Sequence, residues 1–132
     1  MTSSGASARP RDATFFLAPA WLRPLLNLLP LLLVGLALFD GLGWGPHRAL
    51  GGAIAVPILA LIMLSQRTPL RHHRGKVAQL LGLYGLQVTL AAGGEAIGAG
   101  PIKALHAANA GLMLRAASNL ARTASSLLSA RP

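Results

Sequence analysis

The sequence predicts an all-α membrane protein, a four-helix transmembrane bundle whose helices run up, down, up and down, with both termini on the inner side. Three observations predict this class. Apolar residues make up 53% of the 132 residues and occur in long blocks. Charged residues make up only 11%, less than half of the share found in a typical soluble domain. The basic residues lie almost wholly between and beyond the apolar blocks.

Composition excludes several other classes. The net charge of +9 is spread over separate segments and not clustered as in a nucleic-acid-binding domain, and no aromatic RNA-binding signature occurs. The absence of cysteine excludes disulfides, thiolate metal sites, cysteine nucleophiles and covalently attached c-type haem. We therefore expect a lipid bilayer, and no nucleic acid, around this chain.

Residues 1–23 are expected to form a disordered and interfacial N-terminal segment. Residues 1–14 are rich in Ser, Ala, Arg and Pro without an apolar period, which is typical of a disordered tail. The phenylalanines that follow, together with Trp21 and Arg23, suit the headgroup level of a bilayer.

The first spanning helix is expected over residues 24–42. Pro24 fits the first helical turn, where its missing N–H costs nothing, and Pro30 predicts a kink within the apolar run. A cleaved signal peptide is the alternative interpretation of this stretch. The absence of a small-x-small cleavage site after Phe39 favours a retained helix.

Three further helices complete a membrane domain over residues 24–129. A basic loop, which cannot enter hydrocarbon cheaply, separates the second apolar block from the third, and a Gly-Ala-Gly-Pro turn follows the third. The expected helices are 47–66, 77–97 and 101–122, the last with a cytoplasmic extension, and residues 130–132 form a tail.

Small residues recur on one face of the third helix, at Gly82, Gly85, Thr89 and Gly93. Small residues let neighbouring helices approach closely in lipid. This pattern predicts that the third helix is the packing spine of the bundle.

The fourth helix has the weakest apolar signal. Arg115, Asn119 and Arg122 recur on one of its faces. We therefore expect its second half to emerge along the membrane surface, and three spanning helices with one interfacial helix is the alternative.

The distribution of Lys and Arg predicts the orientation. Ten of these 12 residues lie on one side of the expected topology, and short connections obey the positive-inside bias. Both ends are therefore expected in the cytoplasm, with the domain in the inner (plasma) membrane, and this orientation requires an even number of spans. The ten residues are Arg9, Arg11, Arg23, Arg67, Arg71, Arg74, Lys76, Arg115, Arg122 and Arg131.

A polar cluster is predicted at the outer level of the bundle, where the ends of three helices meet. One interpretation is structural: Glu95 pairs with Arg48 or Lys103, and a histidine bonds an amide or a backbone carbonyl. Ionisable groups inside a membrane are costly, which is why this cluster calls for an explanation. The candidate residues are His47, Arg48, Glu95, Lys103, His106 and Asn109.

The second interpretation of the cluster is a cofactor site. His47 and His106 lie on different helices at matching depth, and small residues follow each of them. Two such histidines can ligate one haem b from both sides. Adjacent His72 and His73 lie in the basic loop and are expected to be solvated.

No catalytic constellation is recognisable. The three acidic residues are far apart in the sequence, and no phosphate-binding glycine loop occurs. We therefore expect no enzyme activity and no bound metal ion.

Two short stretches, HRALG at residues 47–51 and LHAANA at residues 105–110, resemble a group of small, uncharacterised bacterial membrane proteins with four helices. The resemblance covers about residues 25–122. It implies the fold and a shared role for His47, Arg48, His106 and Asn109, and it implies no activity. A more distant likeness, to four-helix membrane proteins that handle haem, lacks the further histidines of those proteins.

Three classes of function are compatible with these patterns. The first is a non-enzymatic structural or accessory protein, a homo-oligomer or a partner in a membrane complex. The second is a haem b protein that transfers electrons or handles haem. The third is a small transporter subunit, suggested by the prolines inside the first two helices.

Overall fold

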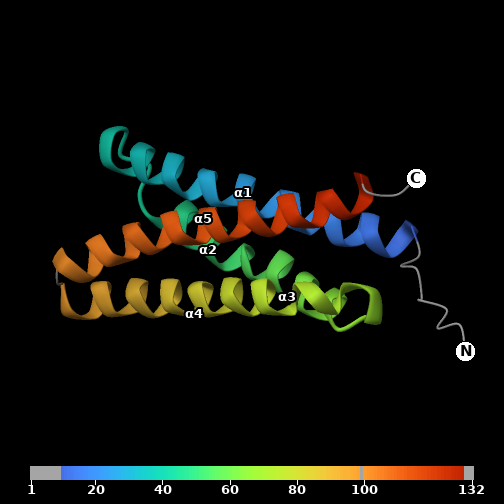
Figure 1. Ribbon diagram of the computed structural model, residues 1–132. Helices are drawn as coiled ribbons and strands as arrows, with labels where there is room; N and C mark the ends of the chain where they lie inside the picture. Colours follow the sequence, from blue (N-terminus) through green and yellow to red (C-terminus); the bar gives the residue numbers. More distant parts are fainter. Residues whose placement is uncertain (1–9, 99, 130–132) are drawn as a thin grey trace, which may run out of the picture.

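A computed structural model describes residues 10–98 and 100–129, and every regular element in these ranges is helical (Figure 1). The all-α class is therefore confirmed. Residues 1–9 and 130–132, which include Arg9, Arg131 and both predicted tails, lie outside the described part of the chain. The elements are α1 (Pro10–Phe39), α2 (Gly45–Ala53), α3 (Ala55–Ser65), the 3-10 helix η1 (Thr68–His73), α4 (Arg74–Ile97) and α5 (Gly100–Ser129).

Three helical segments are long and apolar enough to cross a membrane: Phe15–Phe39, Gly45–Ser65 and Leu70–Ile97. These segments support the prediction of a membrane protein. α5 is not one of them, because alanines and basic residues dilute its apolar character.

α1 begins at Pro10, well before the predicted start at Pro24, so the expected interfacial segment is part of the helix. Pro19, Pro24 and Pro30 all lie inside α1. Each proline removes one hydrogen bond to the carbonyl four residues earlier. α1 is also joined to α5, where the Trp21 Nε1–H donates to Ser125 Oγ at 2.9 Å.

The second predicted helix is broken in the structure. α2 ends at Ala53 and α3 begins at Ala55, with Ile54 in a turn between them. The cause lies four residues later, because the ring of Pro57 has no N–H for the carbonyl of Ala53 and crowds it.

The basic loop is also more ordered than predicted. Thr68–His73 form η1, and α4 then starts at Arg74 instead of residue 77. α4 ends at Gly98, whose φ of 65° is the left-handed cap that glycine adopts without strain. Pro101 follows in the first turn of α5, as the sequence predicted.

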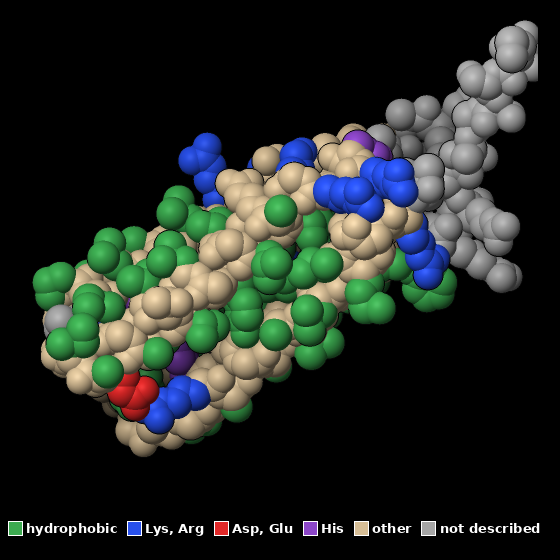
Figure 2. Space-filling view, turned by 90° about the horizontal axis from the view of Figure 1, so that it is seen from below, with side chains coloured by type: hydrophobic (Ala, Val, Ile, Leu, Met, Phe, Trp, Pro, Cys, Tyr) green, Lys and Arg blue, Asp and Glu red, His purple; other side chains and the backbone are tan. Residues whose placement is uncertain are grey.

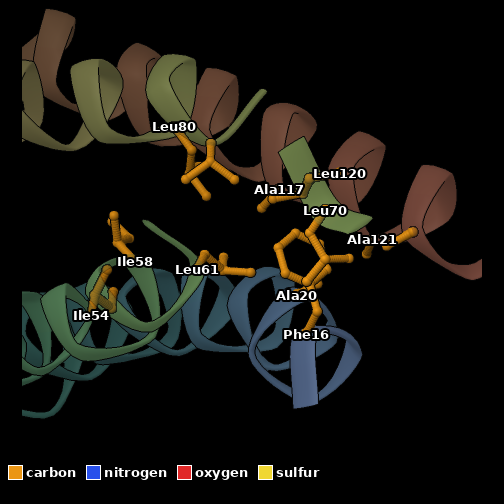
Figure 3. Close-up of a cluster of buried hydrophobic side chains, with 12 residues drawn as sticks. Phe16, Ala20, Ile54, Ile58, Leu61, Leu70, Leu80, Ala117, Leu120 and Ala121 are labelled. Atoms are coloured by element: carbon orange, nitrogen blue, oxygen red, sulfur yellow. The ribbon is translucent and has the colours of Figure 1, made fainter. Parts of the chain in front are cut away.

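α5 is one continuous helix, and its second half remains packed against the rest of the chain. Ala117, Leu120 and Ala121 are buried in that half. They lie against the first turns of α1, where Phe16 and Ala20 are buried (Figure 3). Close approach of these alanine-rich faces packs the second half of α5 on α1.

Each long segment contacts two others: α5 packs on α1 and α4, and α3 packs on α1 and α4. α1 begins and α5 ends at the same end of the molecule as η1 (Figure 1). We name this end, with the basic side chains of η1 and its neighbours, the basic end. The opposite end carries the α1–α2 and α4–α5 connections and is named the Glu95 end. Basic side chains gather at the former, and a red acidic side chain lies beside a blue one at the latter (Figure 2).

The hydrophobic core lies mostly in the half of the molecule nearer the basic end and extends to Ile54 at the middle. In the other half, α2 has no buried residue at all. Along the described part of α4 and α5, the buried residues of that half are Gly94, Asn109 and, close to the midpoint of α5, Met113. The core residues are Phe16, Ala20, Ile54, Ile58, Leu61, Leu70, Val77, Leu80, Ala117, Leu120, Ala121 and Ala124.

The predicted packing spine on α4 is wrong. Gly82, Gly85 and Thr89 are exposed, and a Cβ added at either glycine would meet nothing within 4 Å. Instead, Val77 and Leu80 bury the start of α4. Three of the four small residues therefore face away from the other helices, whereas Gly93 is half-buried beside Ile102 of α5.

Leu80 and Leu81 allow a matched test of where the core lies. Leu80 is 0% exposed and its neighbour Leu81 is 43% exposed. Leu80→Ala is expected to lower the free energy of unfolding by about 2–5 kcal/mol, because it leaves a cavity. Leu81→Ala should cost far less. Reversible unfolding in mixed micelles measures both, and equal losses would contradict the described core.

Candidate functional site: a histidine and amide cluster between α2, α4 and α5

Arg48 and Glu95 join α2 to α4 at the Glu95 end. Arg48 Nη2 lies 2.7 Å from Glu95 Oε1, and both side chains are about two-thirds exposed. An exposed pair of this kind contributes about 0–1 kcal/mol. Lys103, the other predicted partner of Glu95, is exposed on α5 and forms no ion pair with it in the described part of the chain.

His106 on α5 is held by Gln87 on α4. His106 Nδ1 lies 3.2 Å from the Gln87 backbone carbonyl, and His106 Nε2 lies 3.2 Å from Gln87 Nε2. A carbonyl only accepts, so Nδ1 carries the hydrogen. The amide nitrogen only donates, so Nε2 presents its lone pair. Both contacts require the same tautomer of His106.

Asn109, one turn further along α5, completes this link between α4 and α5. Its Nδ2 donates to the Leu83 carbonyl at 2.9 Å and to Gln87 Oε1 at 2.6 Å. Asn109 is 3% exposed, and its Oδ1 has no hydrogen-bond partner among the described residues. Gln87 therefore connects the two polar residues that the LHAANA stretch places on α5.

His47 approaches the cluster from α2. Its Nδ1 lies 3.1 Å from the Pro30 carbonyl on α1, so this nitrogen also carries the hydrogen. The His47 and His106 ring centroids are 6.3 Å apart, with 63° between the ring planes. Trp44 meets His47 edge-on at 6.0 Å. The structure thus brings the two predicted histidines to one place from different helices.

Tyr84 is a further member of this region, outside the predicted polar cluster. Its hydroxyl donates to the Gly51 carbonyl of α2 at 3.2 Å. α2 has no buried side chain, so it is linked to α4 by this hydrogen bond and the Arg48–Glu95 pair. Long side chains, and not close helix contact, bridge this part of the molecule.

A second polar group lies in the basic half, and the sequence did not reveal it. Arg23, expected at the headgroup level, is 0% exposed, and its Nη1 donates to Asn27 Oδ1 at 2.6 Å. Arg23 Nε, Arg23 Nη2 and Asn27 Nδ2 have no partner among the described residues. The available signal was the spacing of Phe16, Ala20, Arg23 and Asn27, which places all four on one face of a continuous helix.

His73 also departs from expectation. It was predicted in a solvated loop, but η1 buries it to 1% exposure and stacks it on Phe16, with ring centroids 5.1 Å apart. Its neighbour His72 is exposed, as predicted. In the part of the chain that the structure describes, no three His, Asp or Glu side chains gather as a metal site.

The comparisons with known proteins support the expectation of an uncharacterised family. Residues 30–94 match the model of a family of unknown function, DUF6220. The match covers just under half of the chain, from within α1 to near the end of α4. It includes His47 and Gln87 but not His106. No curated protein and no solved structure matches the chain.

A double-mutant cycle tests the link between Gln87 and Asn109. Interhelical hydrogen bonds in membrane proteins contribute about 0.6 kcal/mol on average and up to about 1.7 kcal/mol. We expect Gln87→Leu and Asn109→Leu to show a coupling energy in this range. The control cycle pairs Gln87→Leu with Asn119→Leu, an exposed site further along α5, and should be additive. Additivity in both cycles would disprove the contact.

Proposed function

We propose that the chain is an integral membrane protein that crosses the inner (plasma) membrane of a bacterial cell four times, with both ends in the cytoplasm. We further propose that it acts as a non-enzymatic accessory subunit of a membrane complex. The first proposal concerns its placement, and the second concerns what contacts it there.

The apolar surface supports a lipid environment. More large apolar side chains are exposed than buried, and Leu25, Leu28 and Leu32 of α1 are among them. Green apolar side chains cover much of the flank between the two ends (Figure 2). A soluble monomer rarely exposes contiguous apolar patches larger than a few hundred Å². Exposure of such an apolar flank carries no free-energy penalty when hydrocarbon surrounds it.

The position of α5 supports a fourth crossing despite its weak hydropathy. Lys76 Nζ, at the start of α4, lies 2.6 Å from Thr123 Oγ1 of α5. α5 therefore runs beside α4 from the Glu95 end to the basic end (Figure 1). Its 30 residues extend about 45 Å, which exceeds the hydrocarbon thickness of about 30 Å.

Charge supports the orientation. Exposed Arg67, Arg71, Arg74 and Arg122 lie towards the basic end. At the Glu95 end, Arg48 is paired with an acid. The positive-inside bias then places the basic end in the cytoplasm.

Single-cysteine labelling tests the orientation cleanly because the natural chain has no cysteine. Asp40→Cys at the Glu95 end should react with a membrane-impermeant maleimide in intact cells stripped of any outer barrier. Arg71→Cys and Ser126→Cys should react only after the membrane is permeabilised. Labelling of Asp40→Cys and Ser126→Cys from the same side would overturn the four-span topology.

A polar stripe on α5 is the observation that carries the accessory role. Arg115, Asn119 and Arg122 are exposed, while Ala117 and Leu120 between them are buried. The stripe therefore faces directly away from the core of this chain. Arg115 lies seven residues, or about 10 Å, deeper along the helix than Arg122.

A partner helix is the occupant that this stripe favours. A basic residue facing hydrocarbon costs up to about 2.5–3.5 kcal/mol at the bilayer centre. An Asp or Glu on a neighbouring transmembrane helix would pair with Arg115 and remove most of that cost. An accessory role for this chain therefore consists of such a contact with a helix of a partner protein.

The hydroxyl groups support a role without catalysis. Those of Ser65, Thr89, Thr123, Ser125 and Ser126 all donate to carbonyls three or four residues earlier in their own helices. Such back-bonding is structural. Nucleophilic catalysis requires a hydroxyl that donates to a base instead.

Site-specific photo-crosslinking in native membranes tests the accessory role. A photoreactive residue at position 119 should cross-link to a membrane protein at a helix that bears Asp or Glu, as mapped by mass spectrometry. A matched probe at Ala108, exposed on the same face of α5 but in its apolar half, should not. The adduct should disappear in Arg115→Gln/Arg122→Gln. Lipid adducts alone at position 119 would overturn the proposal.

A further inference from the structure

The geometry points to a cofactor beyond the proposed accessory role. We propose that the half of the molecule nearer the Glu95 end binds one haem b, with the iron held between His47 Nε2 and His106 Nε2. Four observations carry this inference, and none of them depends on a partner protein.

The first observation is the separation of the two imidazoles. Two metal–imidazole bonds of about 2 Å each, plus the distance from each nitrogen to its ring centre, place trans imidazole centroids about 6 Å apart. The observed separation between the His47 and His106 centroids is 6.3 Å. The rings come from α2 and α5, so an iron between them would join two helices that otherwise barely touch.

The second observation is the tautomer of both rings. Each Nδ1–H is directed at a backbone carbonyl, that of Pro30 for His47 and that of Gln87 for His106. This arrangement leaves the lone pair of each Nε2 as the ligating group. Metal-binding histidines are typically oriented in this way, through the nitrogen that does not bind the metal.

The third observation distinguishes haem from a bare metal ion. No third His, Asp or Glu joins the two histidines in the described ranges, and the chain has no cysteine. A zinc site takes three or four protein ligands. Haem iron needs only axial ligands from the protein because the porphyrin supplies the other four. Two neighbouring imidazoles are therefore sufficient for haem and insufficient for a typical metal ion site.

The fourth observation is the uneven packing. The apolar core occupies the basic half, whereas α2 buries no residue. A Cβ added at Gly51 or Gly52 would meet nothing within 4 Å. Ligand sites in helical bundles are built between facing helices from inward side chains. A macrocycle seated here would provide the apolar contacts that this half does not make by itself.

The charges at this end also suit haem. The propionates are carboxylates, and Arg48 and Lys103 are exposed near the cluster. A charge-assisted hydrogen bond to Lys103 would leave the Arg48–Glu95 pair intact. On binding, Gln87 Nε2 would release His106 Nε2, while the backbone carbonyl of Gln87 still orients Nδ1.

Visible spectroscopy of the full chain in mild detergent tests the proposal. The protein, reconstituted with haem b, should show a Soret band and, after dithionite supplies one electron to the ferric iron, the sharp α band of a six-coordinate low-spin haem. Loss of a second-shell partner costs about 10–100-fold in metal affinity. Removal of a ligand, in His47→Ala or His106→Ala, should lower haem affinity by at least about tenfold.

Two controls keep this test decisive. His72→Ala removes an exposed histidine at the basic end and should bind haem like the wild type. Circular dichroism and gel filtration should show that each variant remains helical and monodisperse. A folded wild type without a Soret band after reconstitution would overturn the proposal, as would full haem binding by both site variants. Neither result would affect the photo-crosslinks at position 119.

Discussion

The contact between the first turns of α1 and the last turns of α5 is the interaction on which the rest of the structure depends. Phe16 and Ala20 meet Ala121 there, and small side chains let the two backbones come close. The contact includes the part of α1 that precedes Pro24, which is helical in the structure. It also holds the second half of α5, which is weakly apolar, against α1.

With the core concentrated at the basic end, the two halves of the molecule differ in character. One half is filled by apolar side chains and includes the buried Arg23–Asn27 pair. The other is held by the Arg48–Glu95 pair and by polar contacts around Gln87. Packed interiors resist change because their side chains interdigitate. The polar half, which lacks such packing, is the half suited to hold a ligand.

The predictions from sequence succeeded where the structure depends on residues close together in the chain. Long apolar blocks indicated helices and a membrane setting, and Gly98 with Pro101 indicated the turn before α5. They failed where the position of a residue depends on packing against a neighbouring helix. Pro24 looked like a helix start because nothing local shows that α5 will support the backbone before it. Gly82 and Gly85 looked like a packing face, yet α4 buries Val77 and Leu80 instead.

The sequence by itself determined that this chain is helical and apolar, with most of its basic residues at one end, because hydrocarbon admits satisfied backbone and excludes unpaired charge. It also indicated His47 and His106 as residues of interest. Only the tertiary structure decided that the centroids of their rings lie 6.3 Å apart, that Gln87 orients one of them, and that Arg23 is buried. These outcomes depend on which faces of separate helices meet, and spacing along one chain does not specify the rotation of one helix against another.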